Sequence, residues 1–456
     1  MSSEWLYCRL EDLAASKDGA IAIGPFGSRL KADCYVDSGV AIIRGTNLAE
    51  SKNLSGEFVY ISEEKAYELG NANLKPEDLV FPHRGNIGAV GLVPDDGLRY
   101  ALSTSLMKIT LDTQRALPSF YYYFFRSQRG QAELLKNASQ VGTPGIATPL
   151  TSLRGCVVPF PSLNEQEAAV AVLSSLDDRI ALLRETNATL EAIAQAHFKS
   201  WFVDFDPVRA KAEGQEPEGL SAEIAGLFPD SFDESGSGLV PKGWSQTTLG
   251  QVGARHGGSI QTGPFGSQLH ASDYVVAGVP VIMPKDLANR RVNEQSIARI
   301  QQSDADRLAR HKVQAGDIVF SRRGDVERHA LIGELEAGWI CGTGCLLVRP
   351  GSAWPSPTFL SMALDEQRAR KWLVRHAVGA TMPNLNTGIL ADVPLLMPQT
   401  EILGAFENIV KATEEKRSAN FEYIQVLTDL RDALLPRLIS GQLRLPEAEA
   451  LLQDAA

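Results

Sequence analysis

Basic and amide side chains follow a short glycine-rich segment at two places in the chain. Arg29 and Lys31 follow a Gly-Pro-Phe-Gly-Ser segment at 24–28, and Gln268 follows an identical segment at 263–267. Guanidinium and ammonium groups bind phosphates and guanine edges, and amide groups bind adenine. Because glycine and proline place these residues on turns, they are candidates for loops that contact a nucleic acid.

The two segments belong to an internal repeat with an offset of 239 residues. The offset holds from Trp5, which matches Trp244, as far as Phe120, which matches Phe359. The register then slips by two residues, and each copy continues into a segment of helical periodicity. A period of this length excludes a solenoid of small repeats and indicates duplication of a whole domain.

The repeat divides the candidate contact residues into two groups, according to whether the equivalent positions of the two copies carry the same residue. Arg84 and Arg323 are equivalent and identical, which fits a shared role such as a phosphate contact or a structural pair. Equivalent residues that differ, such as His83 and Arg322, could discriminate between bases. Arg290 is a cation without a basic counterpart in the first copy. A solvated surface charge is the alternative for each residue taken singly. The DNA-binding candidates are Ser28, Arg29, Lys31, Arg44, His83, Arg84, Ser267, Gln268, Lys285, Arg290, Arg291, Arg322 and Arg323, with His270 beside them.

The sequence carries no motif of a catalytic site or a resident cofactor. It lacks an Asn-Pro-Pro-Tyr tetrad for amino-methylation, a Gly-x-Gly-x-x-Gly turn behind a strand, and a Gly-x-x-x-x-Gly-Lys-Ser/Thr phosphate loop. Residues 63–65 imitate the Glu-x-Lys of a nuclease, but they lie in a charged, surface-like run. We therefore expect a chain without catalytic residues and without a cofactor of its own.

The five cysteines are too few and too scattered for a disulfide framework. Cys341 and Cys345 have a spacing that zinc sites use, but no second pair follows at the usual distance, so we expect no metal site. No apolar run approaches the roughly 18 residues that cross a bilayer, and the start lacks the layout of a signal peptide. We expect a cytoplasmic protein with reduced thiols and no membrane partner.

The net charge of -11 is unevenly distributed. Residues 161–242 carry 15 Asp and Glu against 6 Lys and Arg, whereas residues 243–399 carry 16 Lys and Arg against 13 acids. Residues 1–160 are almost neutral, with 16 basic and 17 acidic residues. The two copies of the repeat thus avoid the acidic excess, so the overall charge does not exclude phosphate contacts.

Short β-branched runs within each copy predict strands. Examples are residues 40–43 (VAII) and 279–282 (VPVI), which are bounded by glycine, proline and asparagine. Short helices separate them. We expect an α+β or α/β fold with two duplicated globular domains, at 1–160 and 243–398.

A segment with the three-and-four spacing of a coiled coil follows each copy. We expect a central helix at 161–205 and a distal helix at 399–445, each interrupted by a buried asparagine that would fix register and partner. The second stripe is expected to include Lys416. Two amphipathic helices that each pack on their own domain are the alternative. The predicted seam is Leu173, Leu176, Ile180, Leu183, Asn187 and Leu190 with Asn420, Tyr423, Leu427, Leu430 and Leu434.

The segment between the central helix and the second copy, residues 206–242, is rich in proline, glycine and acid. This composition predicts a linker or a loosely packed excursion. Residues 446–456 are short, acidic and expected to form a frayed tail.

The order of globular copy, long helix, globular copy, long helix resembles the specificity subunits of Type I restriction-modification systems. The Gly-Pro-Phe-Gly-Ser segment, with its downstream Tyr-Val and Gly-Val pairs, resembles the start of their target-recognition domains. Residues 198–208 (FKSWFVDFDPV) and 239–244 (LVPKGW) look like their central conserved segment and the start of their second domain. Residues 434–443 (LLPRLISGQL) look like the end of their distal helix. The resemblance covers nearly the whole chain.

The resemblance implies that each copy reads one half of a split, asymmetric double-stranded DNA site. It implies that the two helices pair as an antiparallel coiled coil and set the separation of the half-sites. It also implies partners: two modification subunits that bind S-adenosylmethionine and methylate adenine, and restriction subunits that use ATP and Mg²⁺. The chain itself would be a non-catalytic DNA-binding subunit in phage defence.

Two other functions remain open from the residues alone. A protein-interaction scaffold, with duplicated domains that bind proteins, would explain the acidic charge. A specificity subunit of a fused system, whose partner both methylates and cleaves, would share the DNA-reading role. Equivalent basic loops on both copies favour a two-part linear target over a protein surface.

Overall fold

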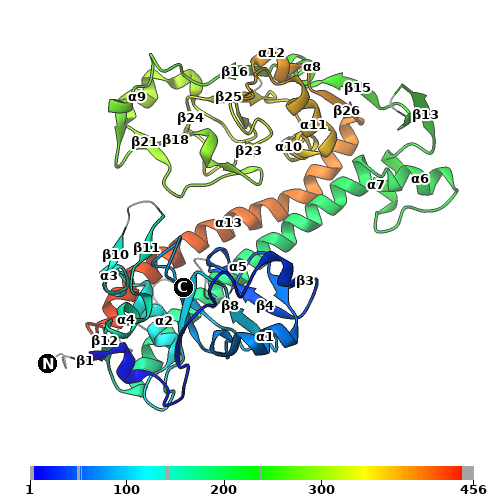
Figure 1. Ribbon diagram of the computed structural model, residues 1–456. Helices are drawn as coiled ribbons and strands as arrows, with labels where there is room; N and C mark the ends of the chain where they lie inside the picture. Colours follow the sequence, from blue (N-terminus) through cyan, green and yellow to red (C-terminus); the bar gives the residue numbers. More distant parts are fainter. Residues whose placement is uncertain are drawn as a thin grey trace. The chain divides into compact units, whose positions relative to one another are not determined.

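The computed structural model describes residues 5–48, 52, 54–139, 143–236, 238–379 and 381–443 (Figure 1). The chain forms two compact units: unit 1 is Met1–Glu185 with Phe421–Ala456, and unit 2 is Thr186–Asn420. Two long helices, α5 (Leu163–Phe202) and α13 (Thr400–Ile439), each contribute residues to both units. Each unit therefore contains one copy of the repeat and part of each helix.

Unit 1 is built on two four-stranded sheets and a two-stranded pair. The first sheet is antiparallel, in the order β2 (Ile21–Ile23), β9 (Leu106–Ile109), β6 (Leu79–Pro82), β7 (Gly91–Leu92). The second has the order β3 (Tyr35–Val36), β5 (Val59–Ile61), β4 (Val40–Ile43), β8 (Tyr100–Leu102), with β4 and β8 parallel. The pair is β1 (Leu6–Arg9) with β12 (Val157–Phe160), and β10 (Ala138–Ser139) forms a hairpin with β11 (Gly145–Ile146).

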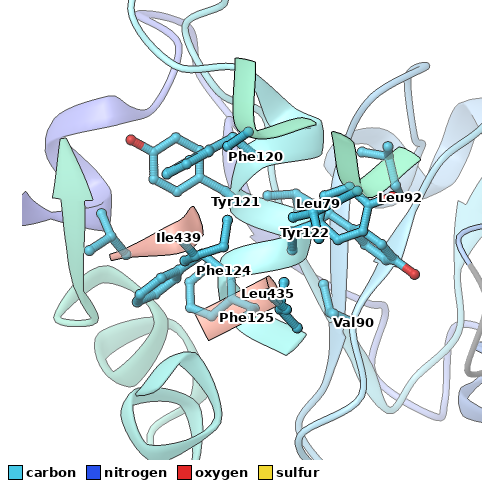
Figure 2. Packing of buried hydrophobic residues seen from close by; sticks show 14 of the residues in the cluster. Leu79, Val90, Leu92, Phe120, Tyr121, Tyr122, Phe124, Phe125, Leu435 and Ile439 are labelled. Carbon is cyan, nitrogen blue, oxygen red and sulfur yellow. The ribbon is translucent and has the colours of Figure 1, made fainter. Parts of the chain in front are cut away.

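The short helices of unit 1 include α2 (Pro118–Arg126), whose aromatic residues form much of one hydrophobic core. The others are α1 (Glu63–Leu69), α3 (Gln128–Leu135) and α4 (Pro149–Arg154). The first eight residues of α2 are buried, because this helix is apolar on nearly every face. Figure 2 shows Phe124 and Phe125 of α2 beside Leu435 and Ile439, which belong to the same hydrophobic cluster. The first copy thus completes its core with residues of α13.

Unit 2 repeats the sheets of unit 1. The first has the order β16 (Ser259–Thr262), β25 (Cys345–Arg349), β22 (Ile318–Ser321), β23 (His329–Leu331). The second has the order β17 (Tyr274–Val275), β21 (Ala298–Ile300), β18 (Val279–Ile282), β24 (Ile340–Cys341). Two-stranded pairs are β15 (Ser245–Thr248) with β26 (Pro394–Met397) and β19 (Leu287–Ala288) with β20 (Arg291–Val292). The short helices are α8 (Leu249–Arg255), α9 (Gln302–Arg307), α10 (Pro357–Asp365), α11 (Gln367–His376) and α12 (Thr387–Ala391).

Strand register confirms the duplication residue by residue. The β6–β9 pairing places Leu79 opposite Ile109, and the β22–β25 pairing places Ile318 opposite Val348, so both numbers rise by the 239 residues of the sequence offset. The parallel pairs β4–β8 and β18–β24 obey the same offset. The predicted mixed fold with two equivalent domains is therefore confirmed.

The predicted pairing of the two long helices is confirmed. In unit 2, Asn187 of α5 contacts Asn420 of α13, and Phe198 contacts Phe406, so the helices run antiparallel there. One part of the stripe was wrong: Lys416 is exposed and Arg417 is buried in its place. Of the predicted seam, eight residues are buried: Leu173, Leu176, Ile180, Leu183, Asn187, Asn420, Leu427 and Leu434. Leu190, Tyr423 and Leu430 are half-buried.

Residues 206–242 are not the loosely packed linker that their composition predicts. The described part contains α6 (Asp206–Ala212), α7 (Ala222–Leu227) and a hairpin of β13 (Phe232–Ser235) with β14 (Gly238–Pro241). Val208 and Phe228 are buried, and the Phe228 ring meets Trp201 edge-on with centroids 5.0 Å apart. A few residues of the segment thus pack in the core of unit 2, while most of its described residues are exposed or half-buried. The predicted tail, 446–456, lies outside the described residues.

Candidate nucleic-acid interface

Three segments of unit 1 leave the first sheet at the same edge. β2 ends at Ile23, which pairs with Met107, and β6 ends at Pro82, which pairs with Leu106. Residues 24–28, 83–88 and 103–105 therefore emerge side by side, and we call them the loop edge of unit 1. The register of β16, β25 and β22 gives unit 2 an equivalent loop edge of residues 263–267, 322–327 and 342–344.

Backbone hydrogen bonds join the segments of each loop edge. In unit 1 the Gly24 amide donates to the Leu106 carbonyl at 2.8 Å, and the His83 amide donates to the Ser105 carbonyl at 2.9 Å. A Cβ atom on Gly24 would lie 1.8 Å from the Ser103 carbonyl oxygen, so only glycine permits this approach. The middle segment thus holds both neighbours in place.

Unit 2 repeats these contacts with different side chains. The Gly263 amide donates to the Cys345 carbonyl at 3.0 Å, and the Arg322 amide donates to the Gly344 carbonyl at 2.8 Å. A Cβ atom on Gly263 would lie 2.0 Å from the Gly342 carbonyl oxygen. The backbone of the loop edge is therefore the constant feature of the two copies.

A fourth segment, which sequence reasoning missed, lies against each loop edge. In unit 1 Arg84 forms a β-bridge with Gly145, and in unit 2 Arg323 forms one with Asn384. The repeat offset relates these bridges as well, and a proline precedes both partners. The signal was present as an equivalent proline in each copy, but the segments lie about 60 residues from the arginines they meet. They add Asn384 as a half-buried amide and Met382 as an exposed apolar side chain.

Arg84 and Arg323 occupy equivalent, exposed positions on the two loop edges. No hydrogen bond or ion pair to either guanidinium comes from the part of the chain that the structure describes. Ser28, Lys31 and Ser267 are exposed as well, as is His270. These side chains remain available to a phosphate or a base edge.

Other candidate residues are engaged within the protein. The Arg29 guanidinium donates to the Glu68 carbonyl. Arg44 donates to the Glu57 carbonyl at 2.8 Å, and Lys285 donates to the Ser296 carbonyl at 3.0 Å. The Gln268 side-chain oxygen accepts from the amide of Phe265 at 3.1 Å. These four side chains shape their loops, and only part of each is free for a ligand.

Three further candidates, His83, Arg291 and Arg322, are buried or half-buried. His83 is buried, and this burial lowers its pKa, so the ring is neutral at pH 7. Its Nε2 atom lies 3.3 Å from the Thr104 carbonyl oxygen. Arg322 and Arg291 are half-buried, and burial lowers the pKa of Arg291. These residues are positioned to support a loop rather than to extend from it.

The predicted place of Arg290 on the binding surface is wrong. Its side chain is 7% exposed, and its Nη2 atom lies 2.5 Å from the Glu191 Oε1 atom of α5. Arg417 of α13 pairs with the same carboxylate. Although burial alone would raise the pKa of Glu191, the two arginines lower it, so the carboxylate stays charged. Arg290 therefore fastens the β19–β20 hairpin to the helix pair within unit 2.

The described residues contain no group of three or more His, Cys, Asp or Glu side chains that could hold a metal ion. Cys341 and Cys345 are buried free thiols. Among the described helices, none has the length and apolarity that crossing a membrane requires.

Comparison with known proteins finds relatives of similar sequence over most of the chain. Residues 3–192 match the family described as "Type I restriction modification DNA specificity domain". The HindI specificity subunit of Haemophilus influenzae is 28% identical over 435 residues, which cover 86% of this chain and 92% of that protein. The MjaIX specificity subunit of Methanocaldococcus jannaschii is 25% identical over 402 residues, covering 86% of this chain and 85% of its own length.

A solved structure is similar to this chain in fold. The crystal structure of the Type I restriction-modification S subunit from M. genitalium aligns with a TM-score of 0.59. The alignment covers 96% of this chain and 97% of the other, at 16% sequence identity. At this level of identity the likeness concerns the fold alone.

Proposed function

We propose that this chain is a Type I specificity subunit and binds double-stranded DNA at a split, asymmetric site, with each loop edge reading one half. The observation that carries the proposal is the repeated loop edge, which presents Arg84 in unit 1 and Arg323 in unit 2 at equivalent exposed positions. Identical cations on a constant backbone suit the phosphates that all DNA shares. The segments that differ between the copies, such as 143–147 and 382–386, suit base edges, which differ between half-sites.

The proposal assigns no chemistry to this chain. S-adenosylmethionine would be bound by two modification subunits, and ATP with Mg²⁺ by restriction subunits, all assembled on this specificity subunit in the cytoplasm. Support comes from the family and from the two 40-residue helices, which supply a long shared element for partners to dock on. Forty helical residues extend about 60 Å, so a helix pair of fixed length would act as the ruler between half-sites.

The test is to co-express the chain with the methyltransferase encoded beside it and to map N6-methyladenine across host DNA by single-molecule sequencing. The proposal expects methylation of a split, asymmetric motif with a fixed gap, and its loss when the chain is deleted. Methylation that is unchanged by the deletion would favour a protein-interaction scaffold instead. If the partner that methylates the motif also cleaves DNA in the same polypeptide, the chain serves a fused system.

A further inference from the structure

Each loop edge presents a phenylalanine to solvent at the same position of the repeat. Phe26 is 79% exposed in unit 1, and Phe265 is 56% exposed in unit 2. The prolines directly before them are buried, and so are Leu30 and Leu269 four residues later. Each ring is thus held out from the surface by a segment that is anchored on both sides.

The same turn holds both rings. The Arg29 amide donates to the Phe26 carbonyl at 2.8 Å, and the Gln268 amide donates to the Phe265 carbonyl at 2.8 Å. In both copies the two residues between the hydrogen-bonded positions of the turn are glycine and serine. The turn therefore presents phenylalanine in the same way in two domains whose other loops differ.

Different side chains fasten this turn in the two copies. In unit 1 the Arg29 guanidinium donates to the carbonyl of Glu68 in α1. In unit 2 the Arg307 guanidinium of α9 donates to the Gln268 carbonyl at 2.9 Å. Positions 29 and 268 are equivalent, as are 68 and 307. The arginine that donates this hydrogen bond therefore lies on the turn in unit 1 and on the opposite helix in unit 2. The fastening residues differ while the exposed ring and its turn are the same, which indicates that the ring itself has a function.

We propose that Phe26 and Phe265 act as apolar wedges, each inserting at a base step of the DNA bound by its own unit. A phenyl ring cannot form hydrogen bonds with base edges, so an identical ring cannot tell two different half-sites apart. It can pack against the faces of bases, which every sequence offers, and phenylalanine wedges open base steps in this way in minor-groove binders. The rings share the loop edge with Arg84 and Arg323, which are placed for phosphates.

This inference rests on the proposed function, and its test uses the complex of the chain with its modification subunits. The probe is a duplex that carries the mapped motif, with 2-aminopurine substituted at one base step at a time. Phe26→Ala and Phe265→Ala are compared with Tyr67→Ala and Val276→Ala, which remove exposed apolar side chains outside the loop edges. Melting temperatures should match the wild type, because all four side chains are exposed.

Each phenylalanine substitution should weaken binding of the motif duplex about 5- to 150-fold, the range found for loss of one aromatic stacking contact. The slope of log K against log salt should stay the same, since no charge is removed. The 2-aminopurine fluorescence that rises on unstacking should be lost only in the half bound by the altered unit. Phe26→Trp, which keeps a stacking surface, should retain affinity.

Wild-type binding of the motif with no change of affinity or fluorescence in the alanine variants would overturn the wedge and leave the proposed function intact. Loss of modification subunits from the DNA-free variant complex, seen by native mass spectrometry, would overturn it in favour of a protein contact. Failure of the wild-type complex to bind the motif would reject the proposed function, and the wedge with it.

Discussion

The buried aspartate before β6 and β22 has a cation partner at a different position in each copy. The Asp78 carboxylate lies 2.8 Å from Lys108 Nζ, and both side chains are almost fully buried. Its counterpart Asp317 lies 2.6 Å from Arg349 Nη2. The equivalent of Arg349 in the first copy is Thr110, which directly follows β9 and lies two residues after Lys108. A buried carboxylate requires a counter-charge, but either position on the strand can supply it.

Lys108→Leu tests whether either position can supply the counter-charge of the aspartate, because leucine occupies the equivalent position in the second copy. The substitution leaves Asp78 buried without its ion-pair partner and should lower the free energy of unfolding by about 3–5 kcal/mol. Adding Thr110→Arg should recover part of this loss, because it recreates the pairing of Asp317 with Arg349. Urea unfolding followed by circular dichroism measures both effects. A double variant no more stable than Lys108→Leu alone would show that position 110 cannot supply the counter-charge.

Arg84→Gln and Arg323→Gln test the shared phosphate contact. Each substitution should weaken DNA binding about equally for all sequences and reduce the slope of log K against log salt by about one unit. The measurement is a titration of the complex with the mapped motif at several salt concentrations between about 50 and 200 mM. Arg9→Gln, at an exposed cation on β1, is the control. An unchanged salt slope would remove both residues from the interface.

His329 should make unit 2 sensitive to acid. Burial lowers its pKa to about 4, and its Nε2 atom lies 3.1 Å from the Ser361 carbonyl oxygen. Between this value and the unfolded pKa of about 6.5, the unfolded chain binds the proton and the folded chain does not. The free energy of unfolding should therefore fall as pH falls from 6.5 to 4, by about 3 kcal/mol in total.

The matched variant is His329→Val, because Val90 is the equivalent residue of the first copy. We expect it to lose stability at pH 7, since it removes a buried ring, but to show a smaller further loss between pH 7 and pH 5. Thermal unfolding at the two pH values compares the variant with the wild type. The same pH dependence in both proteins would show that His329 is not the group responsible.

At the scale of elements, an asparagine pair interrupts the apolar contact of α5 and α13. Asn420 Nδ2 donates to Asn187 Oδ1 at 2.9 Å, and Asn187 Nδ2 lies 3.4 Å from the Arg417 carbonyl oxygen. Both side chains are buried. Asn420 is thus hydrogen-bonded to Asn187, and Asn187 in turn to the backbone of α13, so the pair favours the one register in which the two residues meet.

Asn187→Leu should lower the free energy of unfolding by about 1–3 kcal/mol, because it leaves the buried amide of Asn420 without its partner. The double substitution with Asn420→Leu should restore or exceed wild-type stability, because no buried amide remains unpaired. Thermal unfolding measures the difference, with Asn408→Leu on the exposed face of α13 as the control. A double variant less stable than either single variant would contradict this role.

Periodicity and repetition made the long elements predictable from the sequence. The regular spacing of apolar residues from Leu173 to Leu190 indicates a buried helix face. The constant offset between the copies indicates that they share one fold. Composition failed at residues 206–242, because many prolines, glycines and acids surround the few residues that pack, such as Val208 and Phe228. It also failed at Arg417, because a buried cation that finds a carboxylate partner cannot be told from an exposed one by residue type.

The candidate site was predictable only in part, for the same physical reason. Residue types indicated Arg84 and Arg323, and the structure places them at equivalent exposed positions. They could not reveal that Arg290 reaches Glu191, which lies 99 residues away in the sequence. Contacts of this kind depend on tertiary structure, as does the bridge from Arg84 to residue 145.

At the scale of the whole molecule, the two units differ in how the chain supplies them. Unit 2 is one continuous stretch, whereas unit 1 needs Phe421–Ala456 in addition to Met1–Glu185. Leu435 and Ile439 belong to the same core cluster as Phe124 and Phe125 (Figure 2). The first copy is therefore incomplete without a segment that follows the second copy in the sequence.

Truncation after Asn420 should accordingly damage unit 1 and spare unit 2. Removal of Leu427, Leu434 and Leu435 opens the core around α2, so the amides of α2 should lose most of their protection from hydrogen exchange. The amides of β22 in unit 2 should keep theirs. Hydrogen exchange followed by mass spectrometry distinguishes the two. Protection of α2 equal to that in the full chain would contradict the dependence of unit 1 on α13.

The discontinuity of unit 1 also has a consequence for biosynthesis. A ribosome finishes residues 186–420 before it makes residues 421–443, so the second copy can close while the first still lacks part of its core. We expect the copy that is translated first to fold last. Until then the nascent chain exposes the aromatic residues of α2, which makes it prone to aggregation and a client for chaperones.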